Sequence, residues 1–159
     1  MGAGKTTIGR LLAESLHMEF VDSDHEIEQR TGASIPWIFD VEGEAGFRKR
    51  ESNIINELTQ RTNTVLATGG GVVLSAENRQ ALQSRGTVIY LNASLEQLMT
   101  RTSRDKNRPL LQTEDPKSKL EEILNTRDPL YREIADVVIN TDKTDIRFSL
   151  KNIINALPE

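Results

Sequence analysis

The chain of 159 residues contains no cysteine. This absence excludes disulfides, thiolate metal ligands and a cysteine nucleophile, and it fits a reducing compartment. No apolar run approaches the roughly 18 residues that a membrane helix needs, and the first residues have none of the features of a secretory signal. Positive charge is not in excess either, because 20 Lys and Arg face 24 Asp and Glu, giving a net charge of −4. We therefore expect a cytoplasmic protein with no nucleic-acid partner and no membrane association.

Aromatic residues are also few, at 4% of the chain, but hydrophobic residues reach 36%, which is enough for one domain with its own core. Short apolar runs alternate with segments of helical periodicity. The expected strands are 19–22, 64–67, 87–91 and 137–140. The expected helices begin near residues 6, 25, 34, 44, 76, 94, 117, 127 and 145. This alternation predicts an α/β domain with a parallel sheet covered by helices on both faces.

The start of the chain carries the first indication of function, in Gly2, Ala3, Gly4, Lys5 and Thr6. These residues match the second half of the phosphate-binding pattern G-x-x-x-x-G-K-[ST], and a helical period follows them. Glycines leave backbone N–H groups free to surround phosphate, and the N-terminus of the following helix favours the anion. Lys5 would reach the β- and γ-phosphates, and the Thr6 hydroxyl would bind Mg²⁺. The first glycine of the pattern would lie upstream of Met1, so an ordinary glycine-rich turn is the alternative at this point.

Two carboxylates, Asp22 and Asp24, stand at the end of the expected strand 19–22. Residues two apart on a strand share a face, and open α/β sheets bind ligands at the carboxyl ends of their strands. We expect both carboxylates to face the phosphate loop, one serving a metal and the other a proton. The alternative is that Ser23 or Asp24 caps the next helix, which is compatible with a catalytic role.

Further polar and glycine positions follow along the chain. Arg48 and Glu51 lie three apart in an expected helix and face the same way, although spacing alone favours a solvated ion pair. Three glycines, 69–71, end the strand 64–67 and would let the backbone approach a ligand closely. The charged run 101–107 is typical of a solvated loop, but its place between two helices also suits a lid that brings a cation over phosphates.

Six segments together resemble the shikimate kinase family, in order and in separation. They are MGAGKTTIGR, DSDHEIEQRTG, GEAGFRKRE, ATGGGVV, RPLL and RDPLYREIAD. The resemblance covers essentially the whole chain and is closest to the bacterial type I enzymes. It implies transfer of the γ-phosphoryl group of ATP to the 3-hydroxyl of shikimate, giving 3-phosphoshikimate for aromatic amino acid biosynthesis. Mg²⁺ is the implied cofactor, shikimate and ATP are the implied partners, and the implied state is a monomer.

The resemblance also implies an architecture. The expected fold is a parallel five-stranded sheet with helices on both faces, like that of the P-loop nucleoside-monophosphate kinases. The expected unit is a single domain, 1–159, with a substrate-binding insertion at about 24–60 and a lid at about 103–120.

Roles for individual residues follow from the same resemblance. The residues implied in nucleotide binding are Gly2, Ala3, Gly4, Lys5, Thr6, Thr7, Arg101, Arg108 and Lys143. Those implied in substrate binding are Asp24, Arg48, Glu51, Gly69, Gly70, Gly71 and Arg127. Those implied in metal binding are Thr6 and Asp22, and those implied in catalysis are Asp24, Lys5 and Arg108. The resemblance thus reverses the interpretation of Arg48 and Glu51 as a solvated pair.

One departure from the family concerns the start of the chain. In the family a strand and a Gly-Pro pair precede the position of Met1, and that first strand lies at the centre of a sheet of order two-three-one-four-five. Without it, two neighbouring strands lose backbone partners, and several aliphatic side chains lose burial worth roughly 1.5–3 kcal/mol each. We therefore expect the chain as written to fold poorly or bind ATP weakly, and the natural start to lie upstream.

Two alternatives to a shikimate kinase stay open from the sequence. A related small-molecule kinase, such as a gluconate kinase, is one; the arginines 48 and 127 and the three glycines suit a cyclic carboxylate instead. A non-catalytic nucleotide-binding module with a degenerate phosphate loop is the other. The residues that argue against this second alternative are Lys5, Thr6, Asp22, Asp24 and Arg108.

Overall fold

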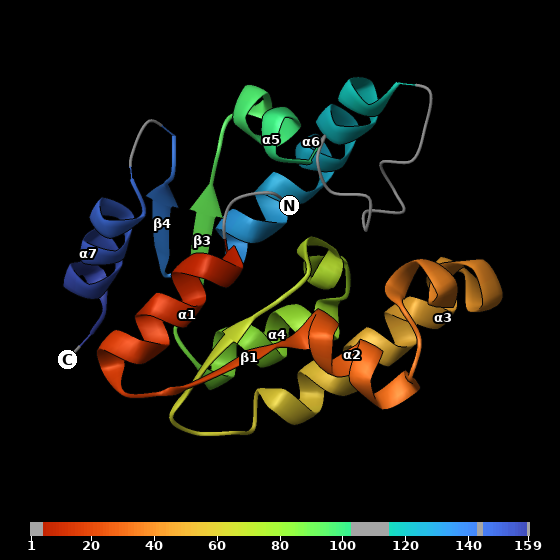
Figure 1. Ribbon diagram of the computed structural model, residues 1–159, viewed down its shortest axis with the longest axis horizontal. Coiled ribbons are helices and arrows are strands. Elements are labelled where there is room, and N and C mark those ends of the chain that lie inside the picture. The colour runs from red at the N-terminus through yellow and green to blue at the C-terminus, as the bar shows by residue number, and fades with distance from the viewer. Residues whose placement is uncertain (1–4, 103–114, 143–144, 159) are drawn as a thin grey trace.

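The computed structural model describes residues 5–102, 115–142 and 145–158, apart from the side chains of residues 101 and 102 (Figure 1). Helices and strands alternate along most of this part of the chain. In order they are α1 (Lys5–Leu16), β1 (Glu19–Asp22), α2 (Ser23–Thr31), α3 (Ile35–Leu58), β2 (Thr64–Ala67), the 3-10 helix η1 (Gly70–Leu74), α4 (Ala76–Arg85), β3 (Ile89–Asn92), α5 (Leu95–Thr102), α6 (Pro116–Ile134), β4 (Val137–Asn140) and α7 (Ile146–Ala156). The predicted α/β class is confirmed.

The predicted five-stranded sheet is wrong for the described residues. They form two separate parallel sheets of two strands, β1 with β2 and β3 with β4. These are the pairs that the order two-three-one-four-five leaves when its central strand is taken out. No strand stands between β2 and β3 in the described part of the chain. Three of the four residues of β2 and all four of β3 are only half-buried, which fits strands with one unpaired edge.

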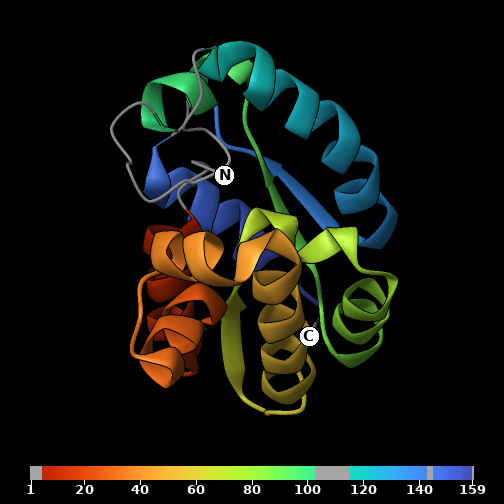
Figure 2. The ribbon, with the colours of Figure 1, turned by 90° about the vertical axis from the view of Figure 1, so that its right-hand side faces the viewer.

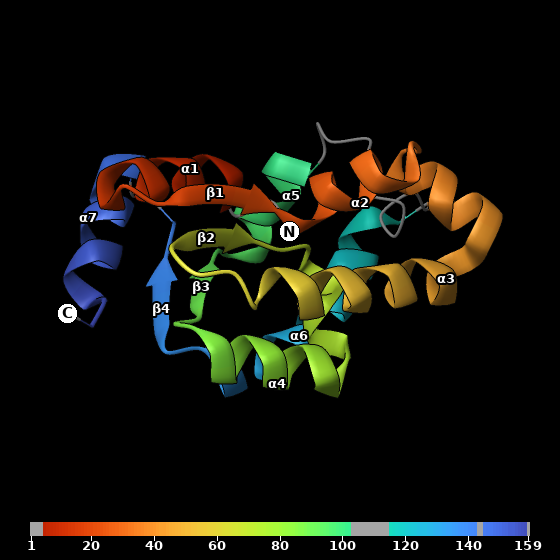
Figure 3. The ribbon, with the colours of Figure 1, turned by 90° about the horizontal axis from the view of Figure 1, so that it is seen from below.

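Helices cover both faces of the strands, as predicted. Successive strand residues point to opposite sides, so each strand offers apolar side chains to both layers of helices. Val65 packs with α1 and α7, while its neighbour Leu66 packs toward α3, η1 and α6. β3 repeats this alternation, with Ile89 on the α1 side and Val88, just before the strand, on the other. Figure 3 shows α1 above and α4 below the strands β2 and β3. α1 therefore packs against both strand pairs and joins them into one body.

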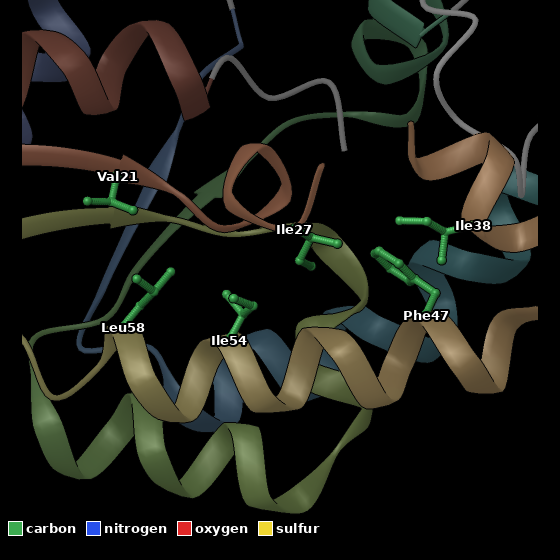
Figure 4. Close-up of a cluster of buried hydrophobic side chains, with 6 residues drawn as sticks. All are labelled: Val21, Ile27, Ile38, Phe47, Ile54 and Leu58. Atoms are coloured by element: carbon green, nitrogen blue, oxygen red, sulfur yellow. The ribbon is translucent and has the colours of Figure 1, made fainter. Parts of the chain in front are cut away.

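A second cluster of buried side chains fixes α2 and α3 beneath β1. Figure 4 shows its six members, which are Val21, Ile27, Ile38, Phe47, Ile54 and Leu58. They come from β1, from α2 and from both halves of α3. Fully burying one such side chain contributes roughly 1.5–3 kcal/mol. The cluster thus holds the polar residues of α2 and α3 at defined positions.

Local signals explain most helix ends. Ser34 caps α3 by accepting a hydrogen bond from the Trp37 N–H, and Gly32 ends α2 with φ of 69°. The sequence prediction of a fresh helix at residue 127 is wrong, because α6 runs through Pro129 without a break. Packing of its buried face outweighs the backbone hydrogen bond that proline removes. The described end of the predicted lid, 116–120, is the first turn of α6, and Leu120 there is buried.

Gly43 divides α3 into two helical halves. Its φ of 75° and ψ of 176° lie in a region that is open essentially to glycine alone. A Cβ built on Gly43 meets no atom within 4 Å, so the neighbouring side chains do not require glycine there. The backbone itself does, and the kink sets the direction from which the second half of α3 enters the core.

The described helices include none that is both long enough and apolar enough to span a membrane.

Gly43→Ala should lower the free energy of unfolding by about 1–3 kcal/mol, the cost of forcing a side chain into this backbone region. Gly86→Ala is the matched control, since a Cβ there also meets nothing within 4 Å and its φ of −177° suits any residue. Denaturant unfolding of both variants measures the difference. Equal stability of the two variants would contradict the assigned kink.

Candidate functional site

The N-terminus of α1 lies beside the carboxyl end of β1. Gly9 of α1 allows this approach, because a Cβ there would stand 2.7 Å from the ring of Phe20. The consequence is that Lys5 and Thr6 meet Asp22. The Lys5 Nζ lies 3.6 Å from Asp22 Oδ2, and the Thr6 hydroxyl donates a hydrogen bond of 3.3 Å to the same oxygen. Three residues predicted for phosphate and metal binding are therefore together.

Asp22 divides its two carboxylate oxygens between two tasks. While Oδ2 faces α1, Oδ1 accepts hydrogen bonds from the backbone N–H groups of Asp24 at 2.9 Å and His25 at 3.4 Å. Asp22 is therefore the N-cap of α2. The alternative that Ser23 or Asp24 caps this helix is wrong, because α2 begins at Ser23 directly after the strand and leaves Asp22 as the cap.

Asp24 lies in the first turn of α2 and not on the strand. The expected reason for its placement, a strand face shared with Asp22, is therefore wrong. Its carboxylate nevertheless reaches the glycine turn that follows β2, because a Cβ on Gly69 would lie 2.9 Å from Asp24 Oδ1. The helical turn thus directs Asp24 toward the end of the neighbouring strand.

Arg48 and Glu51 form an ion pair on the second half of α3, with 2.9 Å between Arg48 Nη1 and Glu51 Oε1. The pair is not solvated, since the Glu51 side chain is only 1% exposed. Burial raises the pKa of Glu51. The positive charge of Arg48 lowers this pKa, and the negative charge of Asp24 raises it further. Arg48 Nε and Glu51 Oε2 are buried with no hydrogen-bond partner among the described residues. Buried polar atoms of this kind call for a partner, which a polar ligand would supply.

The glycine turn runs between α3 and α6, as Figure 2 shows for the yellow-green η1 segment. A Cβ on Gly71 would overlap the guanidinium of Arg48, so only glycine lets that side chain cross the turn. The sequence predicts that a ligand approaches the backbone of these glycines closely. In the structure, the side chains of Asp24 and Arg48 approach Gly69 and Gly71 in this way. On the far side of the turn, the Tyr131 hydroxyl donates a hydrogen bond of 2.6 Å to the Gly70 carbonyl.

Arg127 completes the cluster from α6, where it is buried. Burial lowers the pKa of its guanidinium, and the nearby positive charge of Arg48 adds to this, whereas Glu51 and Tyr131 act in the opposite direction. Arg48, Glu51 and Arg127 therefore share one electrostatic environment. Tyr131, one turn after Arg127, is not among the predicted site residues. The available signals were its i, i+4 spacing from the arginine and its place in the segment RDPLYREIAD.

The structure leaves several predicted residues undescribed. Gly2, Ala3, Gly4, Arg108 and Lys143 lie outside the described residues, as does the side chain of Arg101. Thr7 is exposed in the first turn of α1. Within the described residues, no group of three or more His, Cys, Asp or Glu could hold a metal by itself.

The raised pKa of Glu51 has a consequence for stability. The folded state binds this proton more tightly than the unfolded chain, so the stability it contributes is complete below the ordinary value of 4.5 and is lost as pH rises through the higher folded pKa. The free energy of unfolding of the wild type, minus that of Glu51→Gln, should therefore fall as pH rises through this window. Urea unfolding across a pH series measures it.

Glu57→Gln provides a control on the same helix with the opposite sign. The hydrogen bond from Arg30 lowers the pKa of exposed Glu57, so the same difference for Glu57→Gln should rise as pH rises toward neutrality. If the two stability differences changed with pH in the same direction, the raised pKa of Glu51 would be contradicted.

Comparison with known proteins identifies the family. A protein-family model for shikimate kinase matches residues 1–158. The chain is 60% identical over 156 residues to the shikimate kinase of Methylococcus capsulatus, covering 98% of this chain and 87% of the relative. It is 61% identical over 159 residues to the shikimate kinase of Pseudomonas syringae pv. tomato, covering 100% of this chain and 92% of the relative.

Solved structures agree with the sequence relatives. The structure of shikimate kinase from Acinetobacter baumannii in complex with shikimate matches with a TM-score of 0.95 and 57% identity, over 98% of this chain and 87% of that chain. Shikimate kinase from Aquifex aeolicus matches with a TM-score of 0.82 and 32% identity, over 98% of this chain and 90% of that one. The chain therefore belongs to the shikimate kinase family.

Proposed function

We propose that this enzyme transfers the γ-phosphoryl group of ATP to the 3-hydroxyl of shikimate, giving ADP and 3-phosphoshikimate. The observation that carries the proposal is the cluster in which Arg48 and Arg127 converge from separate helices beside Asp24 and the glycine turn. A ring that bears one carboxylate and several hydroxyl groups suits such a cluster. Family membership at about 60% identity supports the same reaction.

The substrate carboxylate would bind to Arg48 and Arg127. Each guanidinium is a planar fork that can give a carboxylate two parallel hydrogen bonds, which a lysine cannot imitate. Arg48 Nε has a hydrogen to offer, since no described residue accepts it. Glu51 would hold Arg48 through Oε1 and accept a hydrogen bond from a ring hydroxyl through Oε2. The backbone of Gly69, Gly70 and Gly71 would complete this part of the site.

Asp24 would act on the attacking hydroxyl. A carboxylate beside that hydroxyl can orient it and accept its proton, a role worth roughly 10²–10⁴ in rate. Its position between the α1 N-terminus and the glycine turn supports this role, because the two proposed binding regions adjoin there.

The phosphates of ATP would bind at the N-terminus of α1. Lys5 would leave Asp22 for the β- and γ-phosphates, and Gly2, Ala3, Gly4 and Thr7 would contribute the surrounding loop. Lys5 neutralises charge on the group being transferred, which is most of what this reaction asks of a protein.

Thr6 and Asp22 fit a Mg²⁺ ion. They present a hydroxyl and a carboxylate oxygen 3.3 Å apart, and Mg²⁺ in kinases takes few protein ligands, all of them oxygen, together with phosphates and water. When bound there, the ion neutralises negative charge on the phosphates. Asp22 Oδ2 would be the oxygen available to it, since Oδ1 caps α2.

The remaining assignments rest on the sequence resemblance. Arg101 and Lys143 would flank the adenine, and Arg108, in the lid of about 103–120, would reach the phosphates. We propose a monomeric, cytoplasmic enzyme in which one domain, 1–159, carries the whole site.

Shikimate-dependent release of ADP tests the reaction directly. We expect ADP release with shikimate and none with gluconate, because gluconate is not a cyclic carboxylate. Binding of ATP without ADP release in the presence of shikimate would contradict the proposal and favour a non-catalytic nucleotide-binding module.

Asp24→Asn should lower kcat by about 10²–10⁴-fold while leaving ATP binding unchanged, because it removes the proton acceptor and keeps the shape of the side chain. Asp40→Asn, the same change at an exposed position of α3, is the control and should retain full activity. Steady-state kinetics and ATP titration measure the two effects. Turnover of Asp24→Asn within a factor of a few of the wild type would remove Asp24 from the reaction.

A further inference from the structure

Tyr131 connects two parts of the proposed substrate site that come from distant segments of the chain. Its hydroxyl donates a hydrogen bond of 2.6 Å to the carbonyl of Gly70, 61 residues earlier. It also stands one helical turn after Arg127, on the same face of α6. The two side chains line one small cavity together. A single residue thus touches the glycine turn and accompanies the buried arginine.

The bond to Gly70 determines the orientation of the turn. A peptide unit is planar and trans, so its C=O and N–H point in opposite directions. Fixing the Gly70 carbonyl toward Tyr131 therefore also fixes the direction of the Gly71 N–H. The turn has an internal hydrogen bond, from the Val72 N–H to the Gly69 carbonyl at 3.2 Å. Because glycine has no side chain to hold its backbone, the bond from Tyr131 adds a constraint from a separate element.

The second connection is to Arg127. Because the Tyr131 hydroxyl gives its one proton to Gly70, its oxygen is left as an acceptor for the guanidinium. Arg127 is buried, stands one turn earlier and lines the same small cavity, which places its guanidinium near that oxygen. Burial lowers the pKa of Arg127, and Tyr131 acts in the opposite direction. Tyr131 is therefore placed to hold the buried guanidinium in one orientation.

The ring of Tyr131 is held independently of its hydroxyl. It packs against the ring of Tyr90, with 4.8 Å between the centroids and 39° between the planes. The Tyr90 hydroxyl uses a different partner, donating a hydrogen bond of 2.7 Å to Asp128 Oδ1. Replacing either tyrosine by phenylalanine thus keeps the ring pair and removes one defined hydrogen-bonding group.

We infer that Tyr131 is a positioning residue for substrate binding, which orders the Gly69–Gly71 turn and Arg127 together for the shikimate carboxylate and ring. This inference rests on the proposed function. It assigns to Tyr131 an effect on shikimate and none on ATP. The described residues of the proposed phosphate site, Lys5 and Thr6, lie on α1 and bind Asp22, whereas Tyr131 binds Gly70.

The test compares Tyr131→Phe with Tyr90→Phe, in the full chain, by kinetics in each substrate. Tyr131→Phe should raise KM for shikimate about tenfold, the effect of one lost hydrogen bond in a buried site, with KM for ATP within twofold of the wild type. Tyr90→Phe should leave both KM values within twofold. Loss of folded protein lowers the rate at all substrate concentrations and does not raise KM. Thermal unfolding of both variants therefore measures the change in stability separately from the change in KM.

A double-variant cycle identifies the partner through which Tyr131 acts. If Tyr131 orients Arg127, the effects of Tyr131→Phe and Arg127→Lys on KM for shikimate should be less than additive. Unchanged KM for shikimate in Tyr131→Phe, with an active wild type, would overturn the inference and leave the proposed function standing. A folded wild type that binds ATP but shows no shikimate-dependent ADP release would overturn both. Equal increases of KM in Tyr131→Phe and Tyr90→Phe would reduce Tyr131 to a packing residue.

Discussion

The substrate side of the site depends on one buried ion pair, between Arg48 and Glu51. Glu51 has almost no contact with solvent, and the charge of Arg48 opposes the tendency of burial to neutralise it. Removing one partner of such a pair leaves an uncompensated buried charge, which typically costs 3–5 kcal/mol. The pair also explains its surroundings, because Arg48 can cross the turn only where Gly71 has no side chain. Arg127 then enters the same environment from α6.

The scaffold delivers these groups by bringing helices to the ends of short strands. The cluster beneath β1 fixes α2 and α3, while α6 approaches from the opposite side of the glycine turn. The two strand pairs are held together by α1 and by the helices of the opposite face, since β2 and β3 share no backbone hydrogen bonds. Packing of the helices thus sets the relative position of the two strand pairs, a task that backbone hydrogen bonds perform in a continuous sheet. Among the described residues, β2 and β3 each have one edge that pairs with no other strand.

Prediction from sequence succeeded where the signal was local. The strands at Glu19–Asp22, Thr64–Ala67 and Val137–Asn140, and the cap at Ser34, follow from apolar runs and turn residues. The meeting of Lys5 and Thr6 with Asp22 follows from the motif and from the rule for strand ends. The roles assigned to these residues stay predictions.

Prediction failed where packing decides between local options. Pro129 is typical of a helix start, but α6 continues through it because its buried face packs against the core. Asp22 could not be told from Ser23 or Asp24 as the cap, since aspartate and serine both favour that position. Tyr131 lies in the segment RDPLYREIAD, but the resemblance assigns it no role, and its importance appears only when Gly70 is seen beside it. The burial of Glu51 likewise depends on segments far from α3 in the sequence.

A crystal structure of the chain with bound shikimate and ADP would examine the carboxylate site most directly. We expect the shikimate carboxylate to lie against the guanidinium groups of Arg48 and Arg127, with a ring hydroxyl at Asp24 and another at Glu51 Oε2. A carboxylate bound elsewhere, with Arg48 and Arg127 contacting only protein groups, would contradict the assignment of the buried ion pair as the basis of substrate recognition.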